Sequence, residues 1–186
     1  MNSRAVFLDR DGTINEDVGY PANAGDLILL PGSAGAIRAL NQQGLKVIVI
    51  SNQSGIGRGL FGHAEVDNLN LDLNERLKAQ GAWIDAFYYC PHAPAADGEP
   101  VCDCRKPGTG LFDRAADELA IELRLSFMVG DKLSDISAGA SCGCRTVLLG
   151  NDELFETAPR YRPDCRVPGL TAAVEWILSQ IGKKPD

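Results

Sequence analysis

Two acidic residues, Asp9 and Asp11, stand two positions apart directly after a short apolar run. The run, residues 5–8, has no polar alternation, which is typical of a strand buried on both faces of a parallel sheet. Gly12 then allows the chain to turn sharply. In that geometry one carboxylate can attack an electrophile while the other transfers a proton. Taken alone, the pair is also compatible with a polar turn between a strand and a loop.

Other polar residues follow predicted strands in the same way. Ser51 comes after one apolar run, and Asp131 comes after another, with Asp135 four positions further on. Lys106 precedes a predicted helix. Each has a simpler explanation, as a turn, a helix cap or a solvated charge. The carboxyl ends of neighbouring parallel strands share one crevice. Because these polar residues all occur at such positions along the chain, they favour a single site over separate explanations.

The chemistry that fits such a crevice is phosphoryl transfer. The four carboxylates would repel one another, and a hard cation such as Mg²⁺ removes that repulsion. Asp9 would attack phosphorus in line and form an aspartyl phosphate, while Asp11 would act first as an acid and then as a base. Lys106 and the hydroxyl of Ser51 would bind the phosphoryl oxygens.

A second set of residues has the spacing of a metal site. Cys90 and His92 form one pair, and Cys102 and Cys104 form another. Three thiols and one imidazole suit a closed tetrahedral Zn²⁺ site. The intervening residues, 93–100, are small and turn-rich, so a metal would explain how they stay ordered. The alternative is a reduced loop without metal.

The hydrophobic pattern alternates short apolar runs with longer amphipathic stretches, which predicts a doubly wound α/β fold with a mainly parallel sheet. The predicted strands are residues 5–8, 46–50, 86–89, 126–129 and 146–149. The predicted helices are residues 33–43, 64–80, 110–122, 134–142 and 170–180.

Composition limits the functional classes. With 186 residues we expect one domain, residues 1–186. The net charge of −7 argues against nucleic-acid binding. We find no signal-peptide pattern and no apolar run long enough to span a membrane, so we expect a cytoplasmic protein, monomeric by default. We expect Cys142 and Cys144 to be buried or incidental, and Cys165 to lie in the core.

These residues resemble the haloacid dehalogenase superfamily of aspartate-nucleophile phosphatases. The matching motifs are Asp9-x-Asp11-Gly12-Thr13, Ser51-Asn52, Lys106 and Gly130-Asp131-x-x-x-Asp135. The likeness extends to the D-glycero-D-manno-heptose 1,7-bisphosphate phosphatases. It lies in residues 7–15, 51–56, 89–92 with 102–107, and 128–133.

The resemblance implies a Rossmann-like core in which Asp9 is the nucleophile and Asp11 the acid and base. It implies Mg²⁺ held by Asp9, the carbonyl of Asp11 and Asp131. It also implies a structural Zn²⁺ that positions Arg105 and Lys106. The substrate-contacting residues implied by the resemblance are Asp17, Gly19, Tyr20, Ser51, Asn52, Gln53, Ser54, Arg105, Lys106 and Lys132.

Chain lengths leave no room for a separate cap domain. We therefore expect a capless enzyme in which a short flap, about residues 14–30, the Arg58 region and a zinc loop, residues 90–104, recognise the leaving group.

The sequence departs from the pattern of this family at two places. Ser51 replaces the Thr of many relatives, and Gly-Thr-Gly, residues 108–110, replaces the usual His-Pro-Gly.

The function that the resemblance implies is Mg²⁺-dependent removal of the 7-phosphate of heptose 1,7-bisphosphate, a small phosphorylated sugar. The alternatives are a histidinol-phosphate phosphatase or a broad-specificity sugar phosphatase. From a different class, the chain could be a phosphate-binding module without catalysis. The sequence does not distinguish the α from the β anomer of the sugar.

Overall fold

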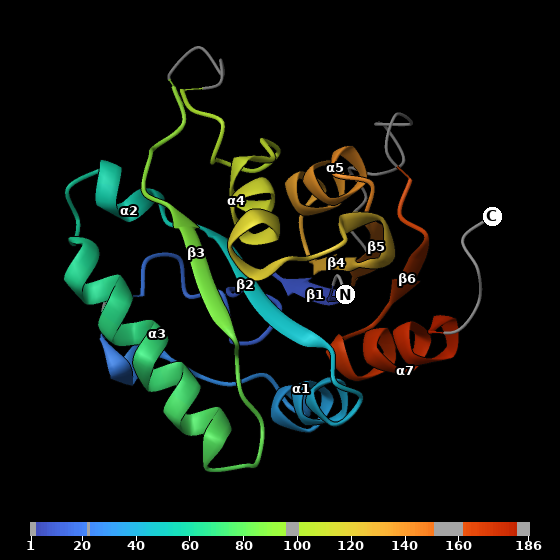
Figure 1. Cartoon of the computed structure of the whole chain (residues 1–186). Helices are drawn as coiled ribbons and strands as arrows, with labels where there is room; N and C mark the ends of the chain where they lie inside the picture. The colour runs from blue at the N-terminus through green and yellow to red at the C-terminus, as the bar shows by residue number, and fades with distance from the viewer. Residues whose placement is uncertain (1–2, 22, 96–100, 151–161, 182–186) are drawn as a thin grey trace.

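A computed structural model describes residues 3–21, 23–95, 101–150 and 162–181. Its centre is a six-stranded sheet in the order β3-β2-β1-β4-β5-β6 (Figure 1), and all neighbouring strands are parallel. The strands are β1 Ala5–Leu8, β2 Lys46–Asn52, β3 Ala86–Cys90, β4 Phe127–Gly130, β5 Arg145–Leu149 and β6 Cys165–Val167.

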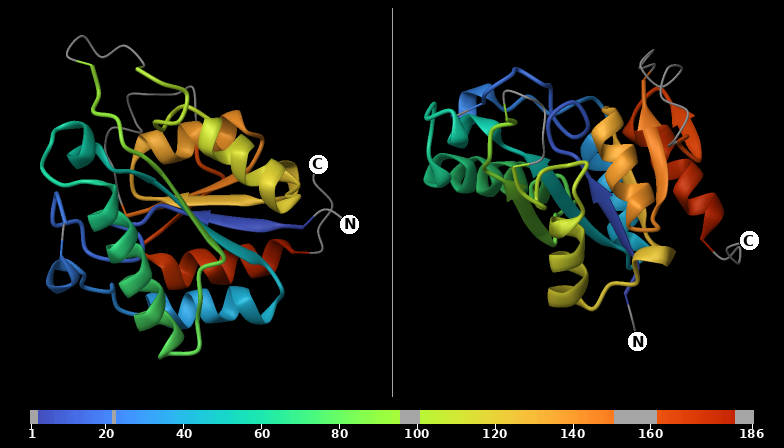
Figure 2. Two further views of the ribbon diagram at one scale, coloured as in Figure 1. Left: turned by 60° about the vertical axis from the view of Figure 1, so that its left-hand side comes forward. Right: turned by 90° about the horizontal axis from the view of Figure 1, so that it is seen from above.

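Helices cover both faces of this sheet, as the two views of Figure 2 show. Helices α1, α3 and α7 pack on one face with a large apolar cluster, and α4 and α5 pack on the other. The helices are α1 Ser33–Gln42, α2 Ser54–Gly57, α3 His63–Lys78, α4 Gly110–Leu119, α5 Leu133–Ser141 and α7 Leu170–Gln180, with short 3-10 turns at Ala24–Asp26 and Leu123–Leu125. In the described part of the chain, none of these is long and apolar enough to cross a lipid bilayer.

The two central strands, β1 and β4, are buried along their whole length, because helices cover both faces of the sheet. Leu8 of β1 lies level with Val49 of β2 and Val129 of β4. The chain order reverses between β1 and β4, so a crevice opens at their carboxyl ends. Asp9 and Asp131 both follow these ends.

The predicted doubly wound α/β fold is confirmed, and β1 has the predicted limits. Strand β2 continues two residues beyond the prediction, because Ser51 and Asn52 pair with β3. The helix predicted to end at residue 122 ends at Leu119 instead. Ala120 has a φ of 50°, a left-handed conformation that cannot continue a right-handed helix.

Among the described residues, helix α2, strand β6 and the two 3-10 turns were not predicted. Helix α2 is only four residues long, and β6 is a three-residue strand at the sheet edge without a long apolar run. Cys165, which we expected in the core, is only partly buried in β6 and packs against the larger apolar cluster. Cys144 is buried as expected, whereas Cys142 is half-buried. Within the predicted flap and zinc loop, residue 22 and residues 96–100 lie outside the described residues.

Gly139 marks the closest packing between α5 and the sheet. A Cβ atom placed there would lie 2.5 Å from Cβ of Met128 and 3.1 Å from Cγ2 of Thr146. We therefore predict that Gly139→Ala lowers the free energy of unfolding by about 1–3 kcal/mol through overpacking, although alanine favours helices. Gly35 of α1 has no atom within 4 Å of such a Cβ, so Gly35→Ala should instead stabilise the protein by about 0.5 kcal/mol. Urea unfolding of both variants checks the prediction, and equal effects would contradict it.

Candidate active site

A cavity of about 370 Å³ opens at the carboxyl ends of β1, β2 and β4. Every residue that we predicted as catalytic or substrate-binding contributes to its lining, together with two further residues. The lining residues are Asp9, Asp11, Asp17, Gly19, Tyr20, Ser51, Asn52, Gln53, Ser54, Arg105, Lys106, Lys132, Ser134 and Asp135. Arg58, which we expected nearby, is exposed beyond α2 and does not line this cavity.

The ammonium group of Lys106 occupies the centre of the buried polar cluster. It lies 2.9 Å from Oδ1 of Asp9 and 2.6 Å from Oδ1 of Asp135, and it donates to the carbonyl of Ile50 at 2.6 Å. The contacts with Asp9 and Ile50 are hydrogen bonds, and the contact with Asp135 is an ion pair. The sequence places Asp135 in the same acidic crevice but assigns it no role, and the structure pairs it with Lys106.

Burial and ion pairing act in opposite directions on this cluster. Burial raises the pKa of Asp9 to about 7, because it disfavours the charged carboxylate, while Lys106 acts against that rise. Burial also acts to lower the pKa of Lys106, but the neighbouring carboxylates of Asp135 and Asp9 outweigh it and raise that pKa. The lysine therefore carries its charge at neutral pH.

Asn52 and Gln53, which we predicted to contact the substrate, form side-chain hydrogen bonds with other residues of the protein. Asn52 accepts from the backbone N–H of Lys106 at 3.0 Å and donates to its carbonyl at 3.1 Å. Gln53 donates to Oδ2 of Asp11 at 2.9 Å and to Oγ of Ser51 at 2.6 Å. Both side chains therefore hold other site residues in place. Sequence reasoning gave no sign of this, because it cannot tell which polar group an amide will face.

An ion pair joins Asp17 of the flap to Lys132 at the cavity. Asp17 lies 2.8 Å from Nζ of Lys132, and its other oxygen accepts from the backbone N–H of Gly19 at 3.0 Å. These hydrogen bonds outweigh partial burial and lower the pKa of Asp17. Lys132 stands directly before α5, and its carboxylate neighbours, Asp17 first, outweigh burial and raise its pKa.

Three carboxylates of the site are close enough to bind one cation. Oxygen atoms of Asp9, Asp131 and Asp135 lie within 4.8 Å of one another. Oδ1 of Asp131 is buried and accepts no hydrogen bond from the described residues, and burial raises the pKa of this carboxyl group. Gly12 makes room for it, since a Cβ there would lie 2.3 Å from Oδ2 of Asp131. A buried oxygen without a donor suits a divalent cation.

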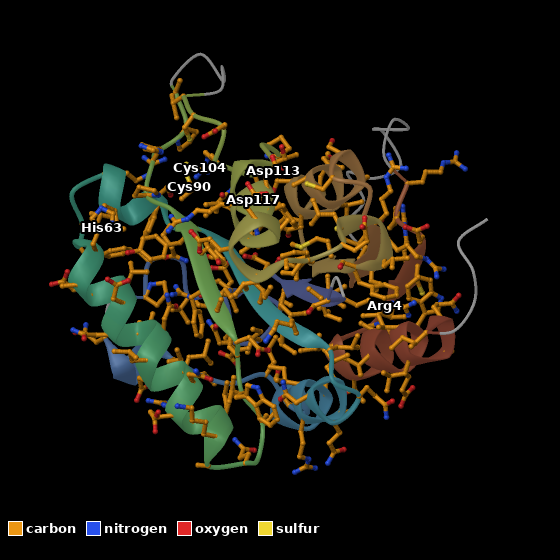
Figure 3. All side chains as sticks on the ribbon, in the orientation of Figure 1. Arg4, His63, Cys90, Cys104, Asp113 and Asp117 are labelled. Atoms are coloured by element: carbon orange, nitrogen blue, oxygen red, sulfur yellow. The ribbon has the colours of Figure 1, made fainter. Side chains whose placement is uncertain are left out.

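The four predicted zinc ligands also lie together, and Figure 3 shows Cys90 and Cys104 beside each other at the end of β3. The three sulfur–sulfur distances are 3.2, 3.3 and 3.6 Å, and Nδ1 of His92 lies 3.5 and 3.4 Å from Sγ of Cys90 and Cys104. A tetrahedral Zn²⁺ site requires about 3.8 Å between sulfurs and about 3.6 Å between sulfur and nitrogen. The cluster is therefore close to the required size.

The cysteine cluster is joined to the active-site cavity through the next residues of the chain. Arg105 follows Cys104 directly, lines the cavity, and donates from Nη1 to the carbonyl of His92 at 3.1 Å. Lys106 comes next. The four clustered ligands thus lie directly before the two cationic residues of the cavity, Arg105 and Lys106.

Comparison with known proteins agrees with this architecture. A family model described as HAD-hydrolase-like matches residues 103–173. With the parallel sheet and the acidic cavity at its carboxyl end, this match defines the chain as a haloacid dehalogenase-like hydrolase.

The nearer relatives narrow this class. The D-glycero-beta-D-manno-heptose-1,7-bisphosphate 7-phosphatase of Escherichia coli O6:H1 is 38% identical, covering 97% of this chain and 92% of that protein. The protein of the same name from Haemophilus ducreyi is 41% identical, covering 95% and 100%. The crystal structure of D,D-heptose 1,7-bisphosphate phosphatase from B. bronchiseptica, complexed with magnesium and phosphate, has a TM-score of 0.84 at 32% identity and covers 95% and 99%. The chain belongs to the heptose-1,7-bisphosphate 7-phosphatase family.

Lys106 is the cation that compensates Asp9 and Asp135, so its removal should be severe. We predict that Lys106→Met lowers the free energy of unfolding at pH 7 by about 3–5 kcal/mol, because two buried carboxylates lose their partner. The loss should shrink as pH falls through about 7, the pKa of Asp9, because Asp9 needs no cation once it is protonated.

Denaturant titrations in Mg²⁺-free buffer between pH 5 and 8 measure this effect. The control is Lys78→Met, which removes an exposed pair with Glu75 and should change stability by less than about 1 kcal/mol at every pH. A loss in Lys106→Met that does not depend on pH would contradict the proposed compensation.

Proposed function

We propose that this chain is a Mg²⁺-dependent phosphatase that removes the 7-phosphate of D-glycero-D-manno-heptose 1,7-bisphosphate. The observation that carries the proposal is the cavity in which Asp9, Asp11 and Lys106 come together at the ends of β1 and β2. The names of the relatives, matched over nearly the whole chain, support the choice of a heptose bisphosphate over histidinol phosphate.

The carboxylate of Asp9 would be the nucleophile. Lys106 binds Oδ1 of Asp9 and orients the carboxylate. Oδ2 would then attack phosphorus as the bond from phosphorus to the sugar oxygen breaks, giving an aspartyl phosphate. Asp11 would donate a proton to the departing sugar oxygen.

The second half of the reaction would regenerate the enzyme. Asp11, now ionised, would take a proton from a water molecule whose oxygen attacks phosphorus. The bond between phosphorus and Asp9 breaks, and inorganic phosphate leaves. Ser51, held by Gln53 at 2.6 Å, and Lys106 would bind the phosphoryl oxygens during both steps.

Asp9, Asp131 and the carbonyl of Asp11 would hold Mg²⁺, as the resemblance implies, and Asp135 lies close enough to contribute. When bound, the ion would neutralise negative charge on the phosphoryl oxygens. The orphaned oxygen of Asp131 supports this proposal, as does the magnesium and phosphate bound to the protein from B. bronchiseptica.

We further propose that Cys90, His92, Cys102 and Cys104 hold a structural Zn²⁺ that orders the loop before Lys106. The observed distances between these ligand atoms support a tetrahedral site. The protein would be a single capless domain, in which the flap and the zinc loop recognise the sugar. It would act in the cytoplasm on a small phosphorylated sugar, as a monomer.

Substrate choice can be tested by phosphate release in the presence of Mg²⁺. The panel holds both anomers of heptose 1,7-bisphosphate, histidinol phosphate, fructose 1,6-bisphosphate and simple monophosphates. We expect one heptose anomer to exceed all other substrates in kcat/KM by at least about 100-fold, which is roughly 2.7 kcal/mol of transition-state discrimination.

The matched control for the panel is Asp9→Asn, which should fold normally and release no phosphate. Full activity in this variant would rule out the covalent mechanism. Preference for histidinol phosphate would overturn the substrate but keep the mechanism. Lack of release from every substrate would favour a phosphate-binding module without catalysis.

Zinc binding can be tested by metal analysis of the purified protein. We expect about one equivalent of Zn²⁺ in the wild type and less than about 0.1 equivalent in Cys102→Ser, because a structural site needs all four ligands. Cys165→Ser, which removes a cysteine of β6 outside the cluster, should keep the metal. Less than about half an equivalent in carefully prepared wild-type protein would contradict the proposal.

A further inference from the structure

Arg10 stands between the two catalytic acids in sequence, and its side chain is one of the largest fully buried ones in the described residues. A guanidinium group keeps its charge at every physiological pH, so its burial is tolerated only when its donors are used. The proposed mechanism gives Arg10 no role and therefore does not explain why its charged side chain is completely buried.

The donors of Arg10 point mainly at one carboxylate. Nε lies 3.1 Å from Oδ1 of Asp11, and Nη2 lies 3.0 Å from Oδ2, so both oxygens are bound by one planar fork. Nη1 donates to Oδ1 of Asn70 at 3.1 Å. Asn70 belongs to α3 and is itself buried. The fork is thus anchored on a helix of the scaffold.

Asp11 receives two more hydrogen bonds. Asn15 donates to Oδ1 at 2.8 Å, and Gln53 donates to Oδ2 at 2.9 Å. Each carboxylate oxygen therefore accepts two hydrogen bonds, which together fix both the plane and the direction of the group. A side chain that transfers a proton gains rate from such restraint, because misplacement by about 1 Å can lower a rate about 100-fold. One of the four donors must release its oxygen when that oxygen carries the proton.

We propose that Arg10, anchored by Asn70, is a positioning residue that holds the carboxylate of Asp11 in line with the departing sugar oxygen. This assignment rests on the proposed function, since it acts through the acid and base role of Asp11. Arg10 itself need not touch the substrate, and the described cavity lining does not include it.

A purely structural role for Arg10 predicts different behaviour. If it only joined the loop after β1 to α3, its removal would affect stability and activity regardless of what stands at position 11. If it acts through Asp11, its effect on turnover should vanish once Asp11 has been replaced. A double-mutant cycle separates the two cases.

The test compares wild type, Arg10→Met, Asp11→Asn and the double variant, by kcat and KM on the best sugar phosphate. We expect Arg10→Met to lower kcat at least about 30-fold with KM changed less than about threefold, a loss within the range of acid–base catalysis. In the Asp11→Asn background the same change should lower kcat less than about threefold. With 4-nitrophenyl phosphate, whose leaving group needs no proton, the loss from Arg10→Met should be smaller.

The matched control is Arg114→Met, which removes an exposed arginine 2.7 Å from Glu118 and should leave kcat unchanged. If Arg10→Met does not fold by circular dichroism, Arg10→Lys carries the same cycle, since it keeps a buried cation but loses the fork. Equal losses in both backgrounds, or unchanged kcat in a folded variant, would overturn the assignment. Absence of phosphate release from the wild type would instead overturn the proposed function and this assignment with it.

Discussion

Like charges held close together at the carboxyl ends of β1 and β4 are the constraint on which the rest of the site depends. Three carboxylates share a space within 4.8 Å, and two of them, Asp9 and Asp135, are almost fully buried. The ammonium group of Lys106 contacts both, and within the described part of the chain Oδ1 of Asp131 has no hydrogen-bond donor. A cation would complete this balance of charge, and the phosphate of a substrate would then meet a site that is no longer repulsive.

The scaffold around this cluster serves mainly to bring one lysine to the right place. Lys106 belongs to a loop rather than to a strand or helix, so its position must be fixed by contacts. Asn52 at the end of β2 binds both backbone groups of Lys106, and the cysteine cluster closes the loop just before it. A metal at that cluster would replace a hydrophobic core for a segment too small and polar to form one.

The side chain of Asp11 is also held firmly by its neighbours. Arg10, Asn15 and Gln53 together donate four hydrogen bonds to Asp11, and Gln53 joins this group to Ser51. Asp9 and Asp11, the proposed nucleophile and acid, are thus held by separate networks that meet at the end of β2. The exposed flap, proposed to recognise the sugar, is joined to Lys132 before α5 by the ion pair of Asp17.

Local pattern by itself determined the fold class, the positions of five strands to within two residues, and the set of residues predicted for the site. Asp9, Lys106 and the four clustered ligands could be named in advance, because each depends on spacing along the chain and on the convergence of parallel strand ends. Only the tertiary structure decided which groups pair. In the structure Gln53 donates to Asp11, and Asp135 pairs with Lys106. Arg10 is buried and donates to Asp11, and α4 ends at Leu119. The physical reason is that hydrogen bonds and ion pairs depend on distances between side chains far apart in sequence, which periodicity does not encode.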